Sequence, residues 1–368
     1  MIMLKIGMVG VGAISGIYLE NITKTFKEIK LVAVCDLIKE RALNAKEKYN
    51  IPKIYDTMYE LFEDEEIDIV LNLTRPYEHF EVSKQALLHG KHVYSEKPLG
   101  ATYAEGKELV RIAEEQGLMI GGAPDTFLGA GIQTCRKLID SGIIGRPIGA
   151  AGYMICRGHE TWHPDPEFYY KFGGGPMLDM GPYYITALVN LLGGVKSVTG
   201  VARKSFEKRM ITSQPHFGEV IDVDVNTHIT GIMEFECGAI GTLTTTFDAI
   251  NPGCHNIEIY GTEGTLIVPD PNCFGGDIIL RHLKDNEEKH LPLMFDYSEN
   301  SRALGLADMA KALETKRAPR ESYKQTLHVL EVMESFTKSS DLRKTVDLET
   351  KYTREAPMLI PELKGILD

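Results

Sequence analysis

Short apolar runs alternate with amphipathic helical segments from Leu4 to about Gly122. This alternation is typical of βαβ units around a parallel sheet, so we expect a doubly wound α/β domain in residues 1–122. Strands are predicted at Leu4–Val9, Leu31–Cys35, Lys53–Tyr55, Ile67–Leu73, His92–Ser95 and Leu118–Ile120. Helices are predicted at Ile14–Lys24, Lys39–Tyr49, Met58–Glu63, Glu78–Leu88 and Tyr103–Glu115. Two helix starts have the capping-box pattern, Thr57-x-x-Glu60 and Thr102-x-x-Glu105.

The rest of the chain has longer alternating runs, which indicate an antiparallel or mixed sheet with one face toward a core. Its strands are predicted at Ile148–Cys156, Lys196–Ala202, Val223–Glu236, Gly238–Asp248, His255–Tyr260 and Gly264–Val268, and its helices at Gly131–Asp140, Ser301–Glu314 and Glu321–Ser339. We therefore expect residues 123–368 to form a second α/β domain with a large open, mostly antiparallel sheet. Few helices can cover this sheet, and a partner subunit is a natural cover, so we expect a homodimer or homotetramer.

Charge and composition narrow the class of partner. The formal net charge of -12 disfavours nucleic acid and anionic membranes, because both require a basic face. No apolar run approaches the roughly 20 residues that span a bilayer, and no signal-peptide pattern is present, so we expect a cytoplasmic protein. The six cysteines and eleven histidines have no zinc, redox or other metal-ligand spacing, and we expect no metal site.

A glycine-rich turn joins the first predicted strand to the first predicted helix. Its glycines let the backbone approach a pyrophosphate, and the helix N-terminus offers free N–H groups. The candidate cofactor contacts in this turn are Gly10, Gly12, Ala13 and Ile14, and Ser15 occupies the usual third glycine position. Asp36 ends the second strand, where its carboxylate can bind a ribose diol and would repel a 2′-phosphate, so NAD is favoured over NADP. The alternative is an ordinary turn, with Asp36 capping the next helix.

The segment Ser95-Glu96-Lys97-Pro98-Leu99 places a lysine at the carboxyl end of a predicted parallel strand. Open α/β sheets bind ligands just beyond such strand ends, so Lys97 is a candidate catalytic group. A lysine before a proline is also typical of a solvated turn, and this alternative stays open on the segment alone.

Four segments together resemble the glucose-fructose oxidoreductase, inositol dehydrogenase and MocA (Gfo/Idh/MocA) family of NAD(P)-dependent oxidoreductases. The segments are the Gly10–Gly12 loop with Asp36, residues 72–79, residues 96–99 and residues 173–183. The resemblance covers nearly the whole chain. It implies a Rossmann domain, a second α/β domain whose open sheet mediates oligomerisation, a tightly bound NAD(P), and a sugar, cyclitol or related polyol as substrate.

The resemblance also implies roles for individual residues. The loop after the fourth strand would lie beneath the nicotinamide half of the cofactor, with contacts from Thr74, Arg75, Pro76 and His79. A strand-to-helix turn with a capping role is the alternative for these residues. Glu96 and Lys97 would belong to the cofactor and substrate motif, in which the lysine contacts the nicotinamide ribose and the reacting hydroxyl. The peptide bond to Pro98 in this motif is typically cis.

The last segment departs from the family pattern, which often has a histidine acid/base four residues after an aspartate. Here Asp179 is followed by Tyr183, as in some members that act on sugars and dihydrodiols. Alcohol oxidation needs a proton acceptor near the hydroxyl, and Tyr183 beside the Lys97 ammonium can supply it, or Lys97 can relay the proton itself. Asp179 shares a helix face with Tyr183 and can orient the substrate or Lys97, although Pro182 is expected to kink that helix or start another. The alternatives are a helix-terminal acid and a core aromatic residue.

The segment before the glycine triplet contains the only tryptophan of the chain. Trp162 and His163 are candidate substrate contacts, because an aromatic face packs against the C–H side of a sugar and an imidazole offers a polar contact. A loop anchored by a buried Trp162 is the alternative.

These residues favour a dehydrogenase that transfers a hydride between NAD and a secondary alcohol of a sugar, cyclitol or related polyol. Two other functions stay open. One is a glycosidase that uses NAD to oxidise C3 transiently, which would release an aglycone without net NADH. The other is a non-catalytic NAD-sensing regulator, against which the presence of Lys97 and Asp179 argues.

Overall fold

The computed structural model describes residues 3–285 and 287–359, which pack into two compact units. Unit 1 contains the described residues up to Gly129, the segment Phe295–Leu327 and the described residues from Glu355 onward. Unit 2 contains the described residues of Ala130–Met294 and His328–Arg354. The domain division at residues 1–122 and 123–368 stays a prediction, but packing joins a late segment of the chain to the N-terminal unit.

Unit 1 is built on a six-stranded parallel sheet, as the alternating pattern predicted. Its strands are β1 (Leu4–Val9), β2 (Ile29–Cys35), β3 (Lys53–Tyr55), β4 (Ile69–Asn72), β5 (His92–Ser95) and β6 (Ile120–Gly122). Their order is β3-β2-β1-β4-β5-β6, so the direction of winding reverses between β1 and β4. Ligands of open α/β sheets bind beyond the strand ends at this point.

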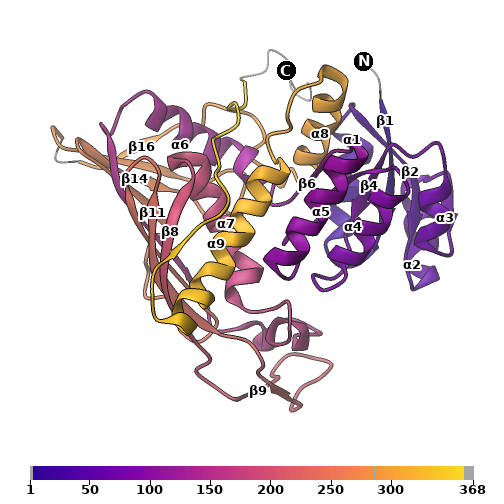
Figure 1. Cartoon of the computed structure of the whole chain (residues 1–368), viewed down its shortest axis with the longest axis horizontal. Coiled ribbons are helices and arrows are strands. Elements are labelled where there is room, and N and C mark those ends of the chain that lie inside the picture. Colours follow the sequence, from indigo (N-terminus) through magenta and orange to yellow (C-terminus); the bar gives the residue numbers. More distant parts are fainter. Residues whose placement is uncertain (1–2, 286, 360–368) are drawn as a thin grey trace. The chain divides into compact units, whose positions relative to one another are not determined.

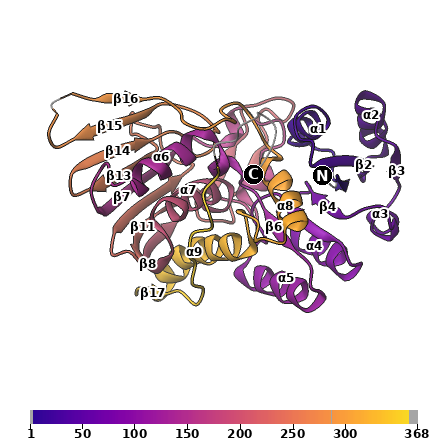
Figure 2. The ribbon, with the colours of Figure 1, turned by 90° about the horizontal axis from the view of Figure 1, so that it is seen from above.

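Helices lie on both sides of this sheet, with α1 and α2 on one side and α3, α4 and α5 on the other (Figure 2). The helices of unit 1 are α1 (Ser15–Lys24), α2 (Lys39–Tyr49), α3 (Met58–Glu63), α4 (His79–Leu88), α5 (Tyr103–Gln116) and α8 (Leu304–Thr315). Both predicted capping boxes are confirmed, because Thr57 and Thr102 each accept a hydrogen bond from the backbone N–H of the glutamate three residues later.

Unit 2 is built on a nine-stranded mixed sheet, which is antiparallel except for the parallel pair of β7 and β12. This agrees with the predicted large, mostly antiparallel sheet. The strands are β7 (Pro147–Ile155), β8 (Val195–Arg203), β11 (His228–Phe235), β12 (Ile240–Thr246), β13 (Ile257–Gly261), β14 (Gly264–Val268), β15 (Ile278–His282), β16 (Lys289–Leu291) and β17 (Val346–Asp347). A separate two-stranded ribbon pairs β9 (Lys208–Met210) with β10 (Val220–Asp222).

One face of the nine-stranded sheet is covered by helices (Figure 1). These are α6 (Ala130–Asp140) and α7 (Pro176–Leu192), and α9 (Tyr323–Leu342) packs on the same side. No helix in the described ranges covers the opposite face, where Val201, Ile232 and Ile240 are 51%, 45% and 58% exposed. None of the helices within residues 3–285 and 287–359 is long and apolar enough to cross a membrane.

Two features of unit 2 differ from the sequence-based expectation. The predicted strand Val223–Glu236 is shorter in the structure, because β10 ends at Asp222 and β11 begins only at His228. Between them the N–H groups of Val223 and Asp224 donate to Glu207 and Tyr170, so the chain leaves one ladder before it joins another. The other difference is α7, which contains Pro182 within a single helix, so no second helix starts there. Pro182 has no N–H for the carbonyl four residues earlier, but every residue from Gly181 to Leu192 is buried, and this packing holds the helix together.

Candidate functional site

The glycine loop of unit 1 lies where the winding direction reverses. Gly10 has a φ of +96°, and a Cβ placed there would lie 2.7 Å from the carbonyl oxygen of Leu73, just beyond β4. A side chain at this position would therefore force the ends of β1 and β4 apart. A Cβ on Gly12 would meet no atom within 4 Å, so the backbone there is open to a ligand. The loop has the close packing and the open side that a pyrophosphate site requires.

The first turn of α1 is left without a side-chain cap, since Ile14 at the N-cap makes no capping hydrogen bond. Its N–H groups can therefore bind an anion. Ser15, at the usual third glycine position, is 3% exposed and donates its hydroxyl to the carbonyl of Gly12 at 2.7 Å. A serine fits here because its short side chain is hydrogen-bonded inside the turn.

Asp36 joins this loop to the end of β2. Its carboxylate accepts hydrogen bonds from the backbone N–H of Val11 at 2.6 Å and of Ile38 at 2.7 Å. A carboxylate has about four lone-pair positions, so both oxygens can still accept a hydrogen bond from a ribose hydroxyl. The residues of the loop, the helix end and Asp36 therefore fit a dinucleotide.

The loops after β4 and β5 are joined by the side chain of His79, which is 1% exposed. Its Nδ1 lies 2.7 Å from the carbonyl oxygen of Pro98, and its Nε2 lies 3.1 Å from that of Thr74. Burial lowers the pKa of His79, so the ring is neutral and donates from one nitrogen only, and the shorter distance favours donation to Pro98. His79 thus holds the turn that follows Lys97 and does not project from the loop. The Lys97–Pro98 bond is cis.

The buried carboxylate of Glu96 holds the backbone of Lys97 in place. Its carboxylate is 7% exposed and accepts hydrogen bonds from the Tyr18 hydroxyl at 2.8 Å and from the backbone N–H of Lys97 at 2.9 Å. Burial and the neighbouring Glu96 raise the pKa of Tyr18, which keeps the phenol protonated as a donor. Both oxygens of Glu96 are engaged within the protein, so the structure gives this residue a positioning role.

Of the remaining loop residues, Thr74 donates its hydroxyl to Asn72 at 2.6 Å, and Arg75 is exposed with its Nη1 3.3 Å from the Tyr77 hydroxyl. Pro76, between Arg75 and Tyr77 in the chain, is partly buried. These contacts fit the strand-to-helix turn that was the alternative, and they leave the Arg75 side chain at the surface of the loop.

In unit 2, Asp179 lies in the first turn of α7 and Tyr183 lies one turn later, 7% exposed. The Asp179 carboxylate contacts a residue that the sequence did not single out as a site residue. His159, from the 3-10 segment His159–Thr161, places its Nε2 3.0 Å from Oδ2 of Asp179. His159 is 9% exposed, and its Nδ1 is buried with no hydrogen-bond partner among the described residues. Lys97 belongs to unit 1, so its pairing with Asp179 and Tyr183 stays a prediction.

Aromatic rings surround His159. The ring centroids of Tyr169, Phe247 and Trp162 lie 4.2, 4.6 and 5.2 Å from its own. Trp162 is 61% exposed, so the alternative of a buried tryptophan anchor is wrong. The neighbouring His163 accepts a hydrogen bond at Nδ1 from the backbone N–H of Asp165 at 3.0 Å, and burial lowers its pKa.

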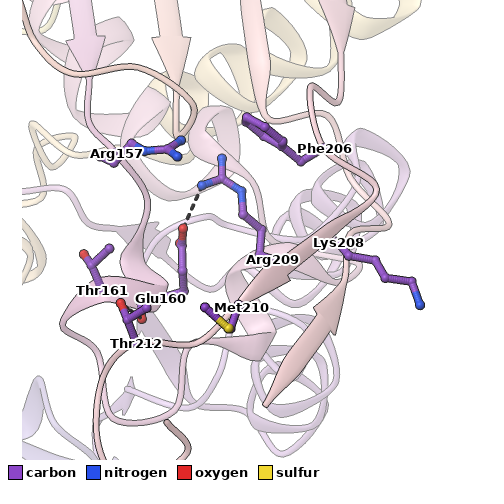
Figure 3. A pocket seen from close by; sticks show the side chains of 8 residues that line it. All are labelled: Arg157, Glu160, Thr161, Phe206, Lys208, Arg209, Met210 and Thr212. Carbon is purple, nitrogen blue, oxygen red and sulfur yellow. Dashed lines mark hydrogen bonds and ion pairs between the residues drawn. The ribbon is translucent and has the colours of Figure 1, made fainter. Parts of the chain in front are cut away.

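A cavity of about 280 Å³ lies beside this segment (Figure 3). Arg209 is 6% exposed and donates to Glu160 at 2.7 Å, to the carbonyl of Phe247 at 2.9 Å and to the carboxylate of Asp248. Glu160 also accepts a hydrogen bond from the Tyr170 hydroxyl. The guanidinium groups of Arg157 and Arg209 approach one another, but the two buried carboxylates neutralise Arg209. The network fixes the residue that follows His159 in the chain.

His159 could not be found by spacing, because it lies twenty residues before Asp179 in an irregular segment. The one indication in the sequence is that His159 lies close to Trp162 and His163, which were predicted to contact the substrate. No group of three or more His, Cys, Asp or Glu side chains in residues 3–285 and 287–359 is arranged to hold a metal ion.

Comparison with known proteins gives two family matches that together span most of the chain. Residues 4–122 match the model of an oxidoreductase family with an NAD-binding Rossmann fold, and residues 132–267 match the GFO/IDH/MocA C-terminal domain. The chain is 28% identical to scyllo-inositol 2-dehydrogenase (NAD(+)) of Bacillus subtilis over 267 residues, which are 72% of this chain and 73% of the relative. It is 25% identical to trans-1,2-dihydrobenzene-1,2-diol dehydrogenase of Bos taurus over 296 residues, 79% and 80% of the two chains.

A solved structure of levoglucosan dehydrogenase with NADH and L-sorbose shares the fold, with a TM-score of 0.81. The sequence identity is 19%, and the match covers 94% of this chain and 99% of that one.

Asp125 provides a test of the buried acidic region behind Lys97. Burial, aided by Glu96, raises the pKa of Asp125 to about 6, above the unfolded value of about 3.9. A raised carboxyl pKa contributes stability below pH 4 that is lost as the pH rises to about 6. We expect Asp125→Asn, whose amide oxygen can still accept the N–H of Gly305, to gain up to about 3 kcal/mol of unfolding free energy relative to wild type between pH 4 and pH 7. Urea unfolding at several pH values measures this, with the exposed Asp296→Asn as the control. A difference that does not change with pH would contradict it.

Arg209 provides a test of the network beside His159. In Arg209→Met, two buried carboxylates lose their cation, and we expect a loss of about 3–5 kcal/mol of unfolding free energy. The control is Lys208→Met, which removes an exposed ion pair to Asp222 and should cost less than about 1 kcal/mol. Equal losses in the two variants, measured by urea unfolding, would show that the network is not a main support of unit 2.

Proposed function

Because the chain belongs to the Gfo/Idh/MocA family of oxidoreductases and carries its NAD-binding Rossmann domain, we propose that it oxidises a secondary alcohol of a sugar, cyclitol or related polyol. One observation carries the proposal. The uncapped end of α1 and the open backbone at Gly12 follow β1, and the Lys97 turn follows β5, one strand beyond the point where the winding reverses. The relatives named for cyclic diols and polyols support the substrate class.

The cofactor is held by residues of unit 1. The backbone N–H groups of Gly12, Ala13 and Ile14 would bind the pyrophosphate, and the carboxylate of Asp36 would accept hydrogen bonds from the adenosine ribose. The loop of Thr74, Arg75 and Pro76 would contact the nicotinamide half. A carboxylate at position 36 repels a 2′-phosphate, which favours NAD over NADP.

Bound NAD supplies the hydride acceptor for the carbinol carbon. The chain has to bind the hydroxyl and remove its proton. We assign this to Lys97, Tyr183 and Asp179, with the lysine ammonium and the phenol hydrogen-bonded to the reacting oxygen and the carboxylate orienting them. The exposed indole of Trp162, with His163 beside it, offers an apolar face for the C–H side of a sugar ring.

The assembly proposed with this function is a homodimer or homotetramer in the cytoplasm. Val201, Ile232 and Ile240 form an exposed apolar strip on the face of the sheet that no described helix covers. A second copy of the chain would bury it. All six cysteines are free thiols, which suits a reducing compartment.

A panel of sugars, cyclitols and dihydrodiols, tested with NAD and with NADP, examines the proposed function. We expect NADH formation with at least one polyol, a clear preference for NAD, and a loss of about 10²–10⁴-fold in kcat for Lys97→Ala. Lys107→Ala, a lysine on α5, is the matched control and should retain activity. If Lys97→Ala keeps the turnover of the wild type, the lysine has no role in the reaction. Release of an aglycone without net NADH would favour the glycosidase, and binding of NAD without any turnover would favour the regulator.

Sedimentation equilibrium tests the assembly. We expect a mass of two or four times 41.0 kDa for the wild type and a smaller species for the double variant Val201→Glu with Ile232→Glu, because charge on the strip opposes burial. The control is Ile250→Glu, which changes an apolar residue that is 79% exposed outside the sheet. A monomeric wild type would contradict the proposed assembly.

A further inference from the structure

The pair of His159 and Asp179 has the geometry of an imidazole oriented by a carboxylate. We propose that His159 is the general base of the reaction, with its Nδ1 receiving the proton of the substrate hydroxyl. The inference rests on the proposed function and adds a residue to the group of Lys97, Asp179 and Tyr183. The histidine that many family members carry at position 183 would then be replaced in its role by one from the segment His159–Thr161.

The contact with Asp179 determines which nitrogen carries the hydrogen. A carboxylate oxygen accepts hydrogen bonds, so the nitrogen 3.0 Å from it, Nε2, is the donor. In the neutral ring this leaves the lone pair on Nδ1. That atom is buried without a hydrogen-bond partner among the described residues, a state that costs free energy until a donor reaches it. A secondary alcohol is such a donor, and its proton is the one that must leave.

The imidazole of His159 is held in place by aromatic packing and by the ion pair of the next residue. Tyr169, Phe247 and Trp162 pack around it with ring centroids at 4.2–5.2 Å. The next residue, Glu160, is held by the buried side chain of Arg209. Because rotation of the imidazole is opposed by packing and by the bond to Asp179, the lone pair points in one direction only.

Other titratable groups lie near the imidazole. They are Asp179 on α7, His163 on the same segment, Tyr169 and Tyr170 from the 3-10 segment Glu167–Tyr170, Glu160 with Arg209, and Cys156 at the end of β7. His163 accepts a backbone N–H at its Nδ1, and Glu160 accepts hydrogen bonds from Arg209 and Tyr170. Burial raises the pKa of Cys156, which keeps the thiol protonated. His159 is therefore the group in this set whose acceptor atom has no partner among the described residues.

The proposed step balances. The C–H bond breaks with both electrons, and the hydride reduces bound NAD⁺ to NADH. The O–H bond breaks with its electrons forming the C=O bond, and the proton goes to Nδ1 of His159. The positive charge that develops on the ring is stabilised by the Asp179 carboxylate at Nε2.

The first experiment reads the tautomer in the protein without cofactor. Proton–nitrogen correlation spectra of the chain labelled with ¹⁵N-histidine are compared with those of His159→Gln, which identifies the signal of His159. We expect a hydrogen on Nε2, which faces Asp179, and none on Nδ1. A ring protonated at Nδ1 would overturn the proposal, and this result does not depend on any substrate.

The second experiment separates proton transfer from orientation of Asp179. In His159→Gln the amide can still donate to Asp179 but cannot accept a proton, so we expect kcat to fall by about 10²-fold or more, with KM changed much less. His290→Gln, at an exposed position of β16, is the control and should keep the kcat of the wild type. If His159→Gln keeps kcat within about threefold, the histidine only positions Asp179 and the proposal is wrong. If the wild type oxidises no polyol, the proposed function fails while the tautomer result still stands.

Discussion

The close approach of Gly10 to Leu73 is the constraint on which the cofactor end of unit 1 depends. The backbone N–H of Gly10 donates to Cys35 at the end of β2, and its Cα faces the carbonyl of Leu73 beyond β4. This position is therefore in contact with both neighbours of β1. The same contact brings Asp36 to the N–H of Val11. A side chain at Gly10 would separate the three strand ends and, with them, the two halves of a dinucleotide site.

Hydrogen bonds between buried polar groups connect the loop after β4 to the turn that contains Lys97. Asn72, fully buried, accepts the Thr74 hydroxyl and donates to the carbonyl of His79 and to Ser83. His79 in turn holds Pro98, and Glu96 holds the N–H of Lys97. Each of these groups would cost about 1–3 kcal/mol if it were left without its partner, so the set adopts one arrangement. The turn that carries Lys97 is thus fixed from inside the protein by Asn72, His79 and Glu96.

The sequence predicted what depends on periodicity and on contacts between neighbouring strands. The parallel sheet, the capping boxes at Thr57 and Thr102 and the place of Asp36 all follow from patterns of a few residues. The bond between His159 and Asp179 could not be predicted, because it depends on how an irregular segment folds back against the start of α7. The late start of β11 at His228 was hidden for the same kind of reason, since residues 223–227 continue the alternation and only the backbone partners of Val223 and Asp224 keep them out of the strand.

His159 lies in the segment before α7, whereas Asp179 lies on α7 itself. A histidine at position 183 would be held by the same helix as Asp179, so its position would be independent of the loops. His159 instead shares one short segment with Trp162 and His163, and that segment is held by Glu160 through a buried cation. The residue that receives a proton and the residues that can contact a sugar ring are then fixed by the same packing. Tyr183, buried one turn after Asp179, can then bind the reacting oxygen without having to act as a strong base.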